Sequence, residues 1–359
     1  MKVTVKDYLN VRVGKPSVNA PTYQYLAPGS ELEVEEQLHQ GDKFEGVTTW
    51  LKDAAGNYYW SGATSRSETT GNQWWIGDYG IDLVWPHSKG EGVTVILLDS
   101  GIREDSPDLF GKTMTKRSVI GDDGTDTFGH GTLMSSIILG SGRSIHGVAP
   151  GVELISIKIT NDGGIRGQDF LEGLNETEKI LDADNNKQFV INCSLVSFGL
   201  GQQFELDAVA SIKRILSHEN VVLCAAAGNN SFRNPHFEII PATVAGVIAA
   251  DGLIKVNGNY ERLLSSNYWP AVNVTAPGEY PIEALKDLFP HVDPQGTSHA
   301  CAYTTGLVAL FASMATAKGK KYNHLDAASL LARITFRDTG FPPSTQLIRE
   351  KIINTSSDS

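Results

Sequence analysis

Two patterns of apolar and polar positions divide the chain near residue 73. Before that point, short stretches alternate apolar and polar residues, as where Leu32 and Val34 lie between three glutamates. Such alternation is typical of half-buried strands. Several of these stretches, separated by Gly, Pro, Asn and Ser, occupy residues 1–62, and a hairpin is expected at Gly56 and Asn57. The pattern predicts a small β-barrel over residues 1–62.

A different pattern follows the polar, turn-rich segment 63–72, which we interpret as a linker. Continuous apolar runs rich in β-branched residues lie at 93–98, 153–159, 188–193, 221–226 and 245–250. Between the runs 188–193 and 221–226 lies a helical pattern, with Leu206, Val209, Ile212, Ile215 and Leu216 at helical spacing. Buried strands that alternate with helices predict an α/β domain over 73–359 with a mostly parallel sheet covered on both faces. Ligand sites in such sheets lie at the carboxyl ends of the strands.

Charge and hydropathy exclude several classes of partner. The 359 residues carry a formal net charge of −11, which disfavours nucleic acid and anionic membranes as main partners. No apolar run approaches the roughly 20 residues needed to span a bilayer, and residues 1–14 alternate like a strand and lack the apolar core of a signal peptide.

The three cysteines, Cys193, Cys224 and Cys301, form neither a disulfide framework nor a zinc-ligand spacing. Their number favours a reducing, cytoplasmic compartment, and the mature form of a secreted protein is the alternative. We expect no cofactor. Burial as small apolar core residues is the simplest role for these cysteines.

Three polar residues lie beside glycines at the edges of apolar elements. Asp99 ends the run 93–98, His130 opens the apolar stretch in "GHGTLMSSII", and Ser298 opens the one in "GTSHACAYTTGLVAL". Singly, each is explained by a turn, a structural histidine or a helix N-cap. Together they supply the parts of acyl transfer: a hydroxyl nucleophile, a base that works near neutral pH, and a carboxylate that orients the base.

The order Asp99, His130, Ser298 along the chain matches that of subtilisin. The motifs "DSGI", "GHGT", "GVAP", "AAAGN", "TAPG" and "GTS" follow one another between residues 99 and 298. In their order and context this part of the chain, about 73–340, resembles the subtilisin-like serine proteases. The resemblance implies a three-layer subtilisin-like domain and a serine endopeptidase that acts on protein or peptide substrates.

The same resemblance implies roles for particular residues. Asp99 is the expected orienting acid, His130 the general base and acid, Ser298 the nucleophile, and Asn229 the side-chain donor to the oxyanion. The segment 191–199 resembles the strand that pairs with the substrate in this family. The expected substrate-binding residues are Ser194, Leu195, Val196 and Gly228.

The sequence departs from the family pattern at several positions. Val196 stands where the family usually has glycine, which predicts a narrow pocket and a preference for small side chains before the scissile bond. His299 follows Ser298 and is expected to be packed or solvated, without a catalytic role. Asp108 lies where calcium ligands often occur, but one carboxylate does not make a site of 6 to 8 oxygens, so no tight metal site is expected.

The N-terminal segment carries a second resemblance. "LNVRVGKPS", "LAPGSELEV" and "GNYYW" are similar to bacterial SH3-like domains, which implies a small β-barrel that binds a peptide or a cell-wall ligand. We expect a role in targeting or control, and a purely structural appendage is the alternative.

Two rival functions are considered for the whole chain. One is a catalytically inactive subtilisin-like scaffold that acts as a binding protein, which labelling of Ser298 would test. The other is an esterase of the α/β-hydrolase type, but that fold places the serine first and within G-x-S-x-G, whereas Ser298 comes last and Ala300 occupies the final glycine position.

Overall fold

The structure is a computed structural model that describes residues 2–5, 8–35, 37–44, 47–64, 73–141, 145–195, 201–231, 239–256, 259–267, 274–279 and 292–334. The chain divides into two compact units. One comprises Met1–Asn72 with Gly142–Ile145, and the other comprises Gln73–Ser141 with His146–Ser359. Each unit is described by itself.

The N-terminal unit consists of short antiparallel strands. They are β1 (Lys2–Thr4), β2 (Leu9–Val13), β3 (Thr22–Leu26), β4 (Glu31–Glu33), β5 (His39–Phe44), β6 (Val47–Lys52) and β7 (Asn57–Trp60), followed by the 3₁₀-helix η1 (Ser61–Ala63). Five strands form one sheet in the order β3-β2-β7-β6-β5, and β1 pairs with β4.

The alternation read from the sequence sets the core of this unit. Val34 is buried, Leu32 is partly buried, and Glu31 and Glu33 are exposed, as predicted. The buried cluster consists of Val3, Val5, Leu9, Val11, Val34, Leu51, Tyr59 and Ala63. The expected hairpin is confirmed between β6 and β7, where the N–H of Gly56 donates to the carbonyl of Asp53 at 3.1 Å.

The second unit is built on an eight-stranded sheet. Its strands are β8 (Val93–Asp99), β9 (Met114–Ser118), β10 (Glu153–Lys158), β11 (Gln188–Cys193), β12 (Val221–Ala226), β13 (Ile248–Val256), β14 (Asn259–Arg262) and β15 (Val274–Pro277). The order is β14-β13-β12-β11-β8-β10-β9, with β15 beside β13. All of these pairs are parallel except β13–β14, so the predicted mostly parallel sheet is confirmed.

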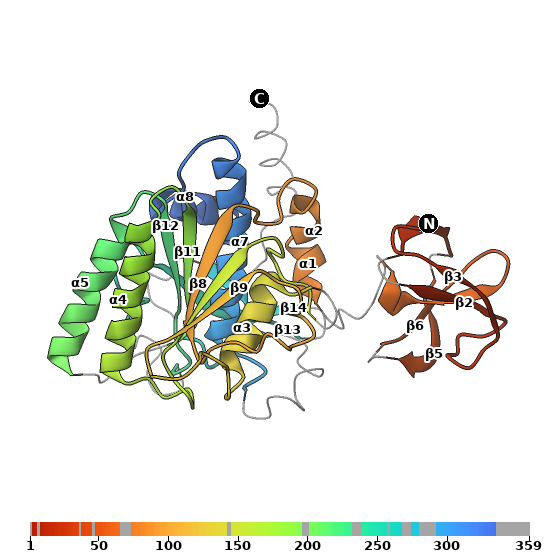
Figure 1. Cartoon of the computed structure of the whole chain (residues 1–359), viewed down its shortest axis with the longest axis horizontal. Helices are drawn as coiled ribbons and strands as arrows, with labels where there is room; N and C mark the ends of the chain where they lie inside the picture. The colour runs from red at the N-terminus through yellow and green to blue at the C-terminus, as the bar shows by residue number, and fades with distance from the viewer. Residues whose placement is uncertain are drawn as a thin grey trace. The chain divides into compact units, whose positions relative to one another are not determined.

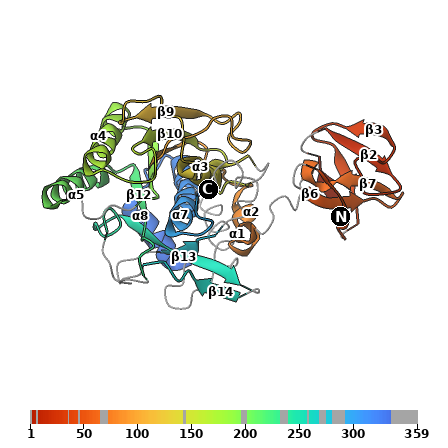
Figure 2. The ribbon, with the colours of Figure 1, turned by 90° about the horizontal axis from the view of Figure 1, so that it is seen from below.

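Helices cover both faces of this sheet (Figures 1 and 2). α4 (Gly167–Ala183) and α5 (Gln202–Leu216) pack against each other on one face, and α3 (His130–Leu139) and α7 (Thr297–Thr316) pack together on the other. The described residues also contain the helices α1 (Trp74–Asp78), α2 (Ile81–Val84) and α8 (His324–Ile334). None of the helices in the described residues is both long and apolar enough to cross a membrane.

Side chains along the central strands point alternately to the two faces of the sheet. Ile96, Leu98, Phe189, Ile191, Val221 and Leu223 belong to the core cluster beneath α4 and α5. Asn192, which directly follows Ile191 in β11, instead donates to Thr305 of α7 at 2.9 Å. Because α7 is buried on nearly all sides, its apolar sequence has no polar face to expose.

Two local predictions need correction. The run 245–250 does not begin a strand, because the turn at Gly246, whose φ is +93°, delays β13 until Ile248. In α5 the buried face consists of Ala208, Ser211, Ile212, Ile215 and Leu216, so Leu206, 59% exposed, lies outside it.

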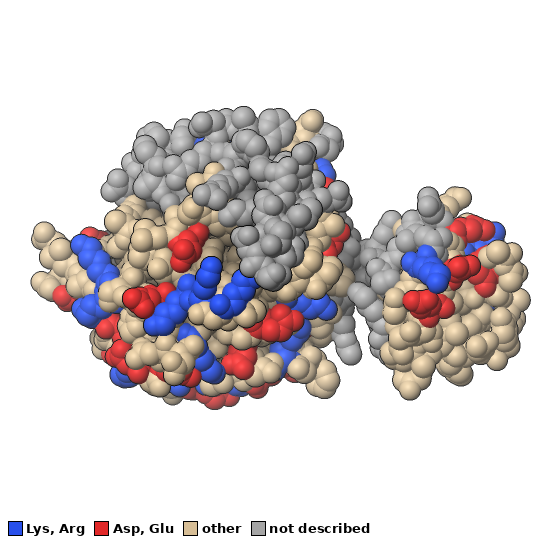
Figure 3. All heavy atoms as spheres, turned by 90° about the horizontal axis from the view of Figure 1, so that it is seen from above, with Lys and Arg blue, Asp and Glu red and all other residues tan. Residues whose placement is uncertain are grey.

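The charged residues on the surface are mixed in sign. On the described part of the face in Figure 3, basic and acidic side chains lie beside one another. Several of them form ion pairs, such as Arg214 with Glu178 between α5 and α4 at 2.9 Å. Exposed pairs of this kind contribute about 0–1 kcal/mol each, so they add little to stability.

Candidate active site

Three neighbouring parallel strands end at the same edge of the sheet. β8 ends at Asp99, β11 ends one residue before Ser194, and β12 ends three residues before Asn229. The parallel register brings these polar residues to one place, since the carboxyl ends of adjacent parallel strands share an edge.

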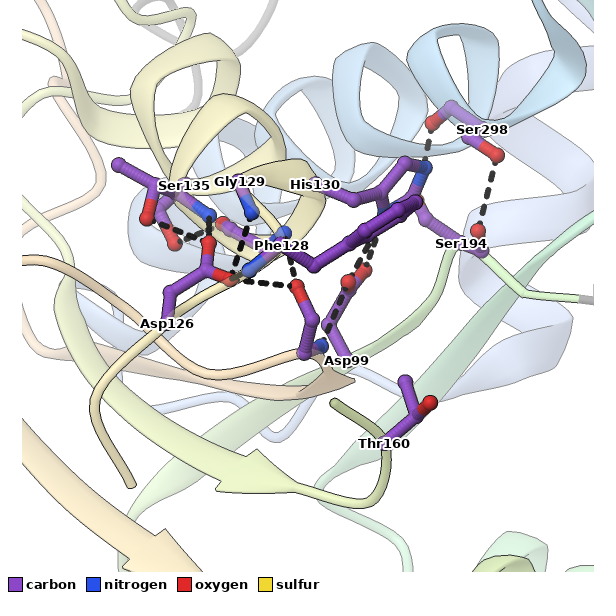
Figure 4. Close-up of polar contacts among 12 residues, drawn as sticks. Asp99, Asp126, Phe128, Gly129, His130, Ser135, Thr160, Ser194 and Ser298 are labelled. Atoms are coloured by element: carbon purple, nitrogen blue, oxygen red, sulfur yellow. Dashed lines mark hydrogen bonds and ion pairs between the residues drawn. The ribbon is translucent and has the colours of Figure 1, made fainter. Parts of the chain in front are cut away.

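Asp99 and His130 form a close pair. The imidazole Nδ1 lies 2.8 Å from Oδ1 and 3.0 Å from Oδ2 of Asp99, whose carboxylate is buried and also accepts the N–H of Ser100 at 2.8 Å. A carboxylate only accepts, so Nδ1 carries the proton and Nε2 keeps a free lone pair. In Figure 4 the ring of His130 lies between Asp99 and Ser298, with its far edge turned toward Ser298.

The surroundings of His130 favour its charged form. Burial lowers the pKa of the imidazole, but the charge and hydrogen bond of Asp99, with a further contribution from the charge of Asp126, leave that pKa above its ordinary value. A base with a raised pKa accepts a proton more readily, which suits removal of a proton from a hydroxyl.

Ser298 is the second residue of α7 and is partly exposed. Its hydroxyl donates to the carbonyl of Ser194 at 2.9 Å, and the hydroxyl of Ser194 donates back to the carbonyl of Ser298 at 2.9 Å (Figure 4). These two bonds fix the start of α7 against the end of β11. A hydroxyl can rotate, so the same oxygen can turn its proton toward His130.

Asn229 is held by the segment that precedes Ser298. Its side-chain oxygen accepts the N–H of Thr297 at 2.9 Å, and the hydroxyl of Thr297 accepts the N–H of Gly228 at 3.0 Å. With Oδ1 engaged, the Nδ2 amide of the exposed Asn229 is left as a donor at the mouth of the site.

Gly228 is required by close packing. Its φ is +96°, and a Cβ there would lie 2.6 Å from Nδ2 of Asn267 and 2.7 Å from Cδ1 of Ile239. Both of its main-chain groups are bonded internally, since its carbonyl accepts the N–H of Asn267 at 2.8 Å and its N–H donates to Thr297. These contacts fix the main chain that leads into Asn229, and the substrate contact expected of Gly228 stays a prediction.

The expected substrate-binding segment is described in part. The Leu195 side chain is buried in the core beside α4 and α5, so its main chain is the part that can face a substrate. Val196 lies outside the described residues.

Asp126 was not among the site residues predicted from the sequence. Its buried carboxylate accepts the N–H groups of Gly129 and Thr132 at 2.7 and 2.9 Å, in the first turn of the helix that His130 begins. The available signal was an acidic residue shortly before a helix start, as in "DTFGHGT".

His299 lies on α7 and is buried at 2% exposure. Burial, and then the nearby charge of His130, lowers the pKa of His299 to about 3. The ring is therefore neutral near pH 7, as suits a packed residue.

All three cysteines are free and buried. Burial raises the pKa of each thiol, to about 12 for Cys301. Among the described residues, no group of three or more His, Cys, Asp or Glu side chains is placed to hold a metal ion. Asp108 is buried in the same unit.

Comparison with known proteins agrees with this fold. A subtilisin-like protease of Coccidioides posadasii is 28% identical over 240 residues, which cover 66% of this chain and 57% of that protein. An intracellular serine protease of Paenibacillus polymyxa is 27% identical over 245 residues, 65% of this chain and 71% of that protein. The chain thus spans little more than half the length of the fungal relative.

Solved structures with the same fold include the prenylagaramide maturation protease PagA, at a TM-score of 0.56 and 22% identity over 75% of this chain and 92% of that one. Fervidolysin from Fervidobacterium pennivorans has a TM-score of 0.59 and 22% identity, over 77% of this chain and 45% of its own. The model of the subtilase family matches residues 90–358, three quarters of the chain. The chain therefore belongs to the subtilase family.

Proposed function

We propose that the protein is a serine endopeptidase that cleaves peptide bonds through an acyl-enzyme intermediate. The observation that carries the proposal is the ring of His130, bonded through Nδ1 to Asp99 and turned toward Ser298 (Figure 4). In this proposal Asp99 orients the base, His130 transfers the proton, and Ser298 attacks the substrate.

The first step begins when the Ser298 hydroxyl turns away from the carbonyl of Ser194. His130 Nε2 takes the hydroxyl proton while Oγ bonds to the substrate carbonyl carbon, and the carbonyl oxygen becomes an anion. The Nδ2 amide of Asn229 and the main-chain N–H of Ser298, at the start of α7, donate to that anion.

The second step breaks the peptide bond. His130 gives its proton to the leaving nitrogen as the C–N bond breaks, and the acyl group remains on Ser298. Water then attacks the ester with His130 again as base, which releases the acid and restores the hydroxyl. Asp99 stays ionised throughout and stabilises the imidazolium in both steps.

A fluorophosphonate probe tests the nucleophile. It is expected to label the wild-type protein and the Ser313→Ala variant, whose lost hydroxyl lies further along the same helix, but not Ser298→Ala or His130→Ala. A folded wild-type protein that takes no label would instead support an inactive scaffold that acts as a binding protein.

Substrate selection is proposed to lie in the segment that contains Ser194, Leu195 and Val196. The substrate main chain pairs with this segment as an added strand, and Val196 narrows the pocket for the residue before the scissile bond. Cleavage of a diverse peptide library, read by mass spectrometry, should show small residues at that position. The Val196→Gly variant should then accept larger ones, and an unchanged preference would rule out this role.

The N-terminal unit is proposed to be an SH3-like module that targets or restrains the protease. Its five-stranded antiparallel sheet and separate core support this assignment. Deletion of residues 1–72 should change the rate or choice of cleavage on protein substrates while hydrolysis of short peptides is retained. Identical rates and identical cut sites on protein substrates would contradict a targeting or restraining role.

A further inference from the structure

Asp126 accepts five hydrogen bonds, although no step of the proposed mechanism uses it. Oδ1 accepts from the hydroxyl of Ser100 at 2.9 Å and from the N–H groups of Phe128 and Gly129 at 3.0 and 2.7 Å. Oδ2 accepts from the N–H and hydroxyl of Thr132 at 2.9 and 2.6 Å. The residue is 2% exposed, and all five donors are neutral. Its negative charge is therefore held in the interior by dipoles (Figure 4).

One of these donors connects Asp126 to both members of the pair Asp99–His130. The Ser100 hydroxyl donates to Asp126 and accepts the N–H of Gly131 at 3.0 Å. Ser100 directly follows Asp99, and Gly131 directly follows His130. A single hydroxyl, oriented by Asp126, therefore fixes the end of β8 relative to the start of α3.

The loop that carries Asp126 is fixed at a second point by a buried cation. The ammonium of Lys158, whose side chain is 0% exposed, donates to the carbonyl of Thr125 at 2.6 Å and pairs with Asp122 at 2.7 Å. Lys158 is the last residue of β10 and lies opposite Asp99 in the parallel register. The neighbouring residue of Asp126 is thus held against the sheet, which limits movement of the carboxylate.

The charge of Asp126 also bears on the imidazole. His130 is the first residue of α3, and the positive end of a helix dipole disfavours a cation there. A carboxylate that accepts amide hydrogens of the same turn offsets that effect. Among the described residues, the other titratable groups that interact with the ring are Asp99 from β8 and His299 from α7, which is neutral. Arg103, which also interacts electrostatically with Asp126, pairs with the carboxylate of Asp105 at 3.1 Å.

We propose that Asp126 is a positioning residue for the proton transfer, which holds His130 in place against Asp99 and whose buried charge favours the imidazolium. This inference rests on the proposed triad, because the imidazolium forms when Ser298 is deprotonated. Two separable effects follow, one from the hydrogen bonds and one from the charge.

Two variants separate these effects. Asp126→Asn removes the charge, and Ser100→Ala removes the bridging hydroxyl while the charge stays. Thr177→Ala, which deletes a buried hydroxyl in α4 that donates to Gly173 at 2.9 Å, is the control for a general loss of stability. For each, the pH profile of kcat/KM is measured on a peptide substrate, together with kcat and KM separately.

For Asp126→Asn, we expect the acidic limb of the profile to move down by about half a pH unit or more, because the imidazolium loses a stabilising charge. For Ser100→Ala, we expect kcat to fall by about tenfold or more, because His130 is no longer held in place. KM and the acidic limb should be nearly unchanged, because the charge of Asp126 is still present. Thr177→Ala should change neither quantity. An unmoved acidic limb in active Asp126→Asn would overturn the electrostatic effect, and an undiminished kcat in Ser100→Ala would overturn the positioning effect.

A second measurement does not depend on activity. The titration of His130 is followed by NMR of ¹³C-labelled histidine in Ser298→Ala and in the double variant Ser298→Ala with Asp126→Asn, and its signal is assigned by His130→Gln. A lower midpoint in the double variant supports the inference even if the wild-type protein fails to hydrolyse peptides, and equal midpoints overturn it even if the protease is active. If Asp126→Asn does not fold, kcat of Ser100→Ala tests the inference: a fall in kcat supports it and an unchanged kcat overturns it.

Discussion

Asp251 gives a prediction whose size follows from the structure. This residue of β13 has a side chain 1% exposed, and its Oδ2 lies 3.0 Å from Nη2 of Arg262 on the antiparallel strand β14. Burial raises the pKa of the carboxyl from 3.8 to about 6, and this outweighs the opposing effects of the Thr275 hydrogen bond and the Arg262 charge. The carboxylate is thus less stable in the folded protein than in the unfolded chain.

The sign of the pH dependence follows from this difference. The folded state binds the proton more tightly, so the stability contributed by protonated Asp251 is fully present below pH 3.8 and is lost as the pH rises through about 6. The gap of about two pKa units corresponds to about 3 kcal/mol. Asp251→Asn cannot ionise, so its free energy of unfolding relative to wild type should rise by up to about 3 kcal/mol between about pH 4 and pH 7.5.

Urea unfolding across this range measures the effect, with Ser298→Ala as the background so that the proposed protease activity cannot digest the sample. Any constant cost of losing the charged partner of Arg262 cancels when differences between pH values are compared. A difference between Asp251→Asn and its background that does not change with pH would refute the reasoning.

Asp122→Asn provides a control of opposite sign. Burial raises the pKa of Asp122, but its hydrogen bonds with Lys158, Ser118 and Gly124 and the charge of Lys158 leave that pKa below its ordinary value. Asp122 therefore contributes stability above its unfolded pKa of about 3.8 that is lost as the pH falls. Asp122→Asn should become increasingly unfavourable relative to its background as the pH rises from about 3 to 5.

Three further predictions concern the site. Gly228→Ala should lower the free energy of unfolding by about 2 kcal/mol or more, because it adds a clash to an unfavourable φ; Gly201→Ala, with a φ of +93° and open space around it, measures the backbone contribution alone by the same urea unfolding. Asn229→Ala should lower kcat by about 10²–10³ with little change in KM, the range known for the loss of this donor in subtilisin, and steady-state kinetics that show an unchanged kcat would exclude the role. Iodoacetamide at about pH 8 should leave the folded protein unmodified and fully active, because its buried thiols stay protonated; mass spectrometry that shows alkylation without unfolding would contradict this.

The strands of the central sheet could be predicted from the sequence because they are buried on both faces. The runs 188–193 and 221–226 are continuous and apolar, and each matches its strand in full. The edge strand β14, antiparallel to β13, has no such signal, since its sequence "NYER" is mostly polar. Leu206 was placed on a buried face because helical spacing does not reveal which side of a helix meets the sheet.

For the site, motifs identified the side chains that can do chemistry but not the groups that hold them. Asp99, His130 and Ser298 lie beside glycines at the ends of apolar elements, which drew attention to them. Asp126 lies in a polar loop, and Ser100, whose hydroxyl donates to it, is 26 residues away in the sequence. A hydrogen bond between residues so far apart depends on the tertiary structure, and no periodic pattern in a single sequence indicates it. The same holds for Thr297, whose bonds to Gly228 and Asn229 span about 68 residues.

Those bonds of Thr297 have a consequence for how the enzyme could be controlled. They join Asn229, the proposed oxyanion donor, to the residue before Ser298, the proposed nucleophile, in one half of the site, while Asp99 and His130 belong to the other half and are joined through Ser100 and Gly131. The two halves meet where the imidazole faces Ser298. Because α3 and α7 pack on each other, a shift of one helix against the other would move His130 away from Ser298 while the bonds within each half stay intact.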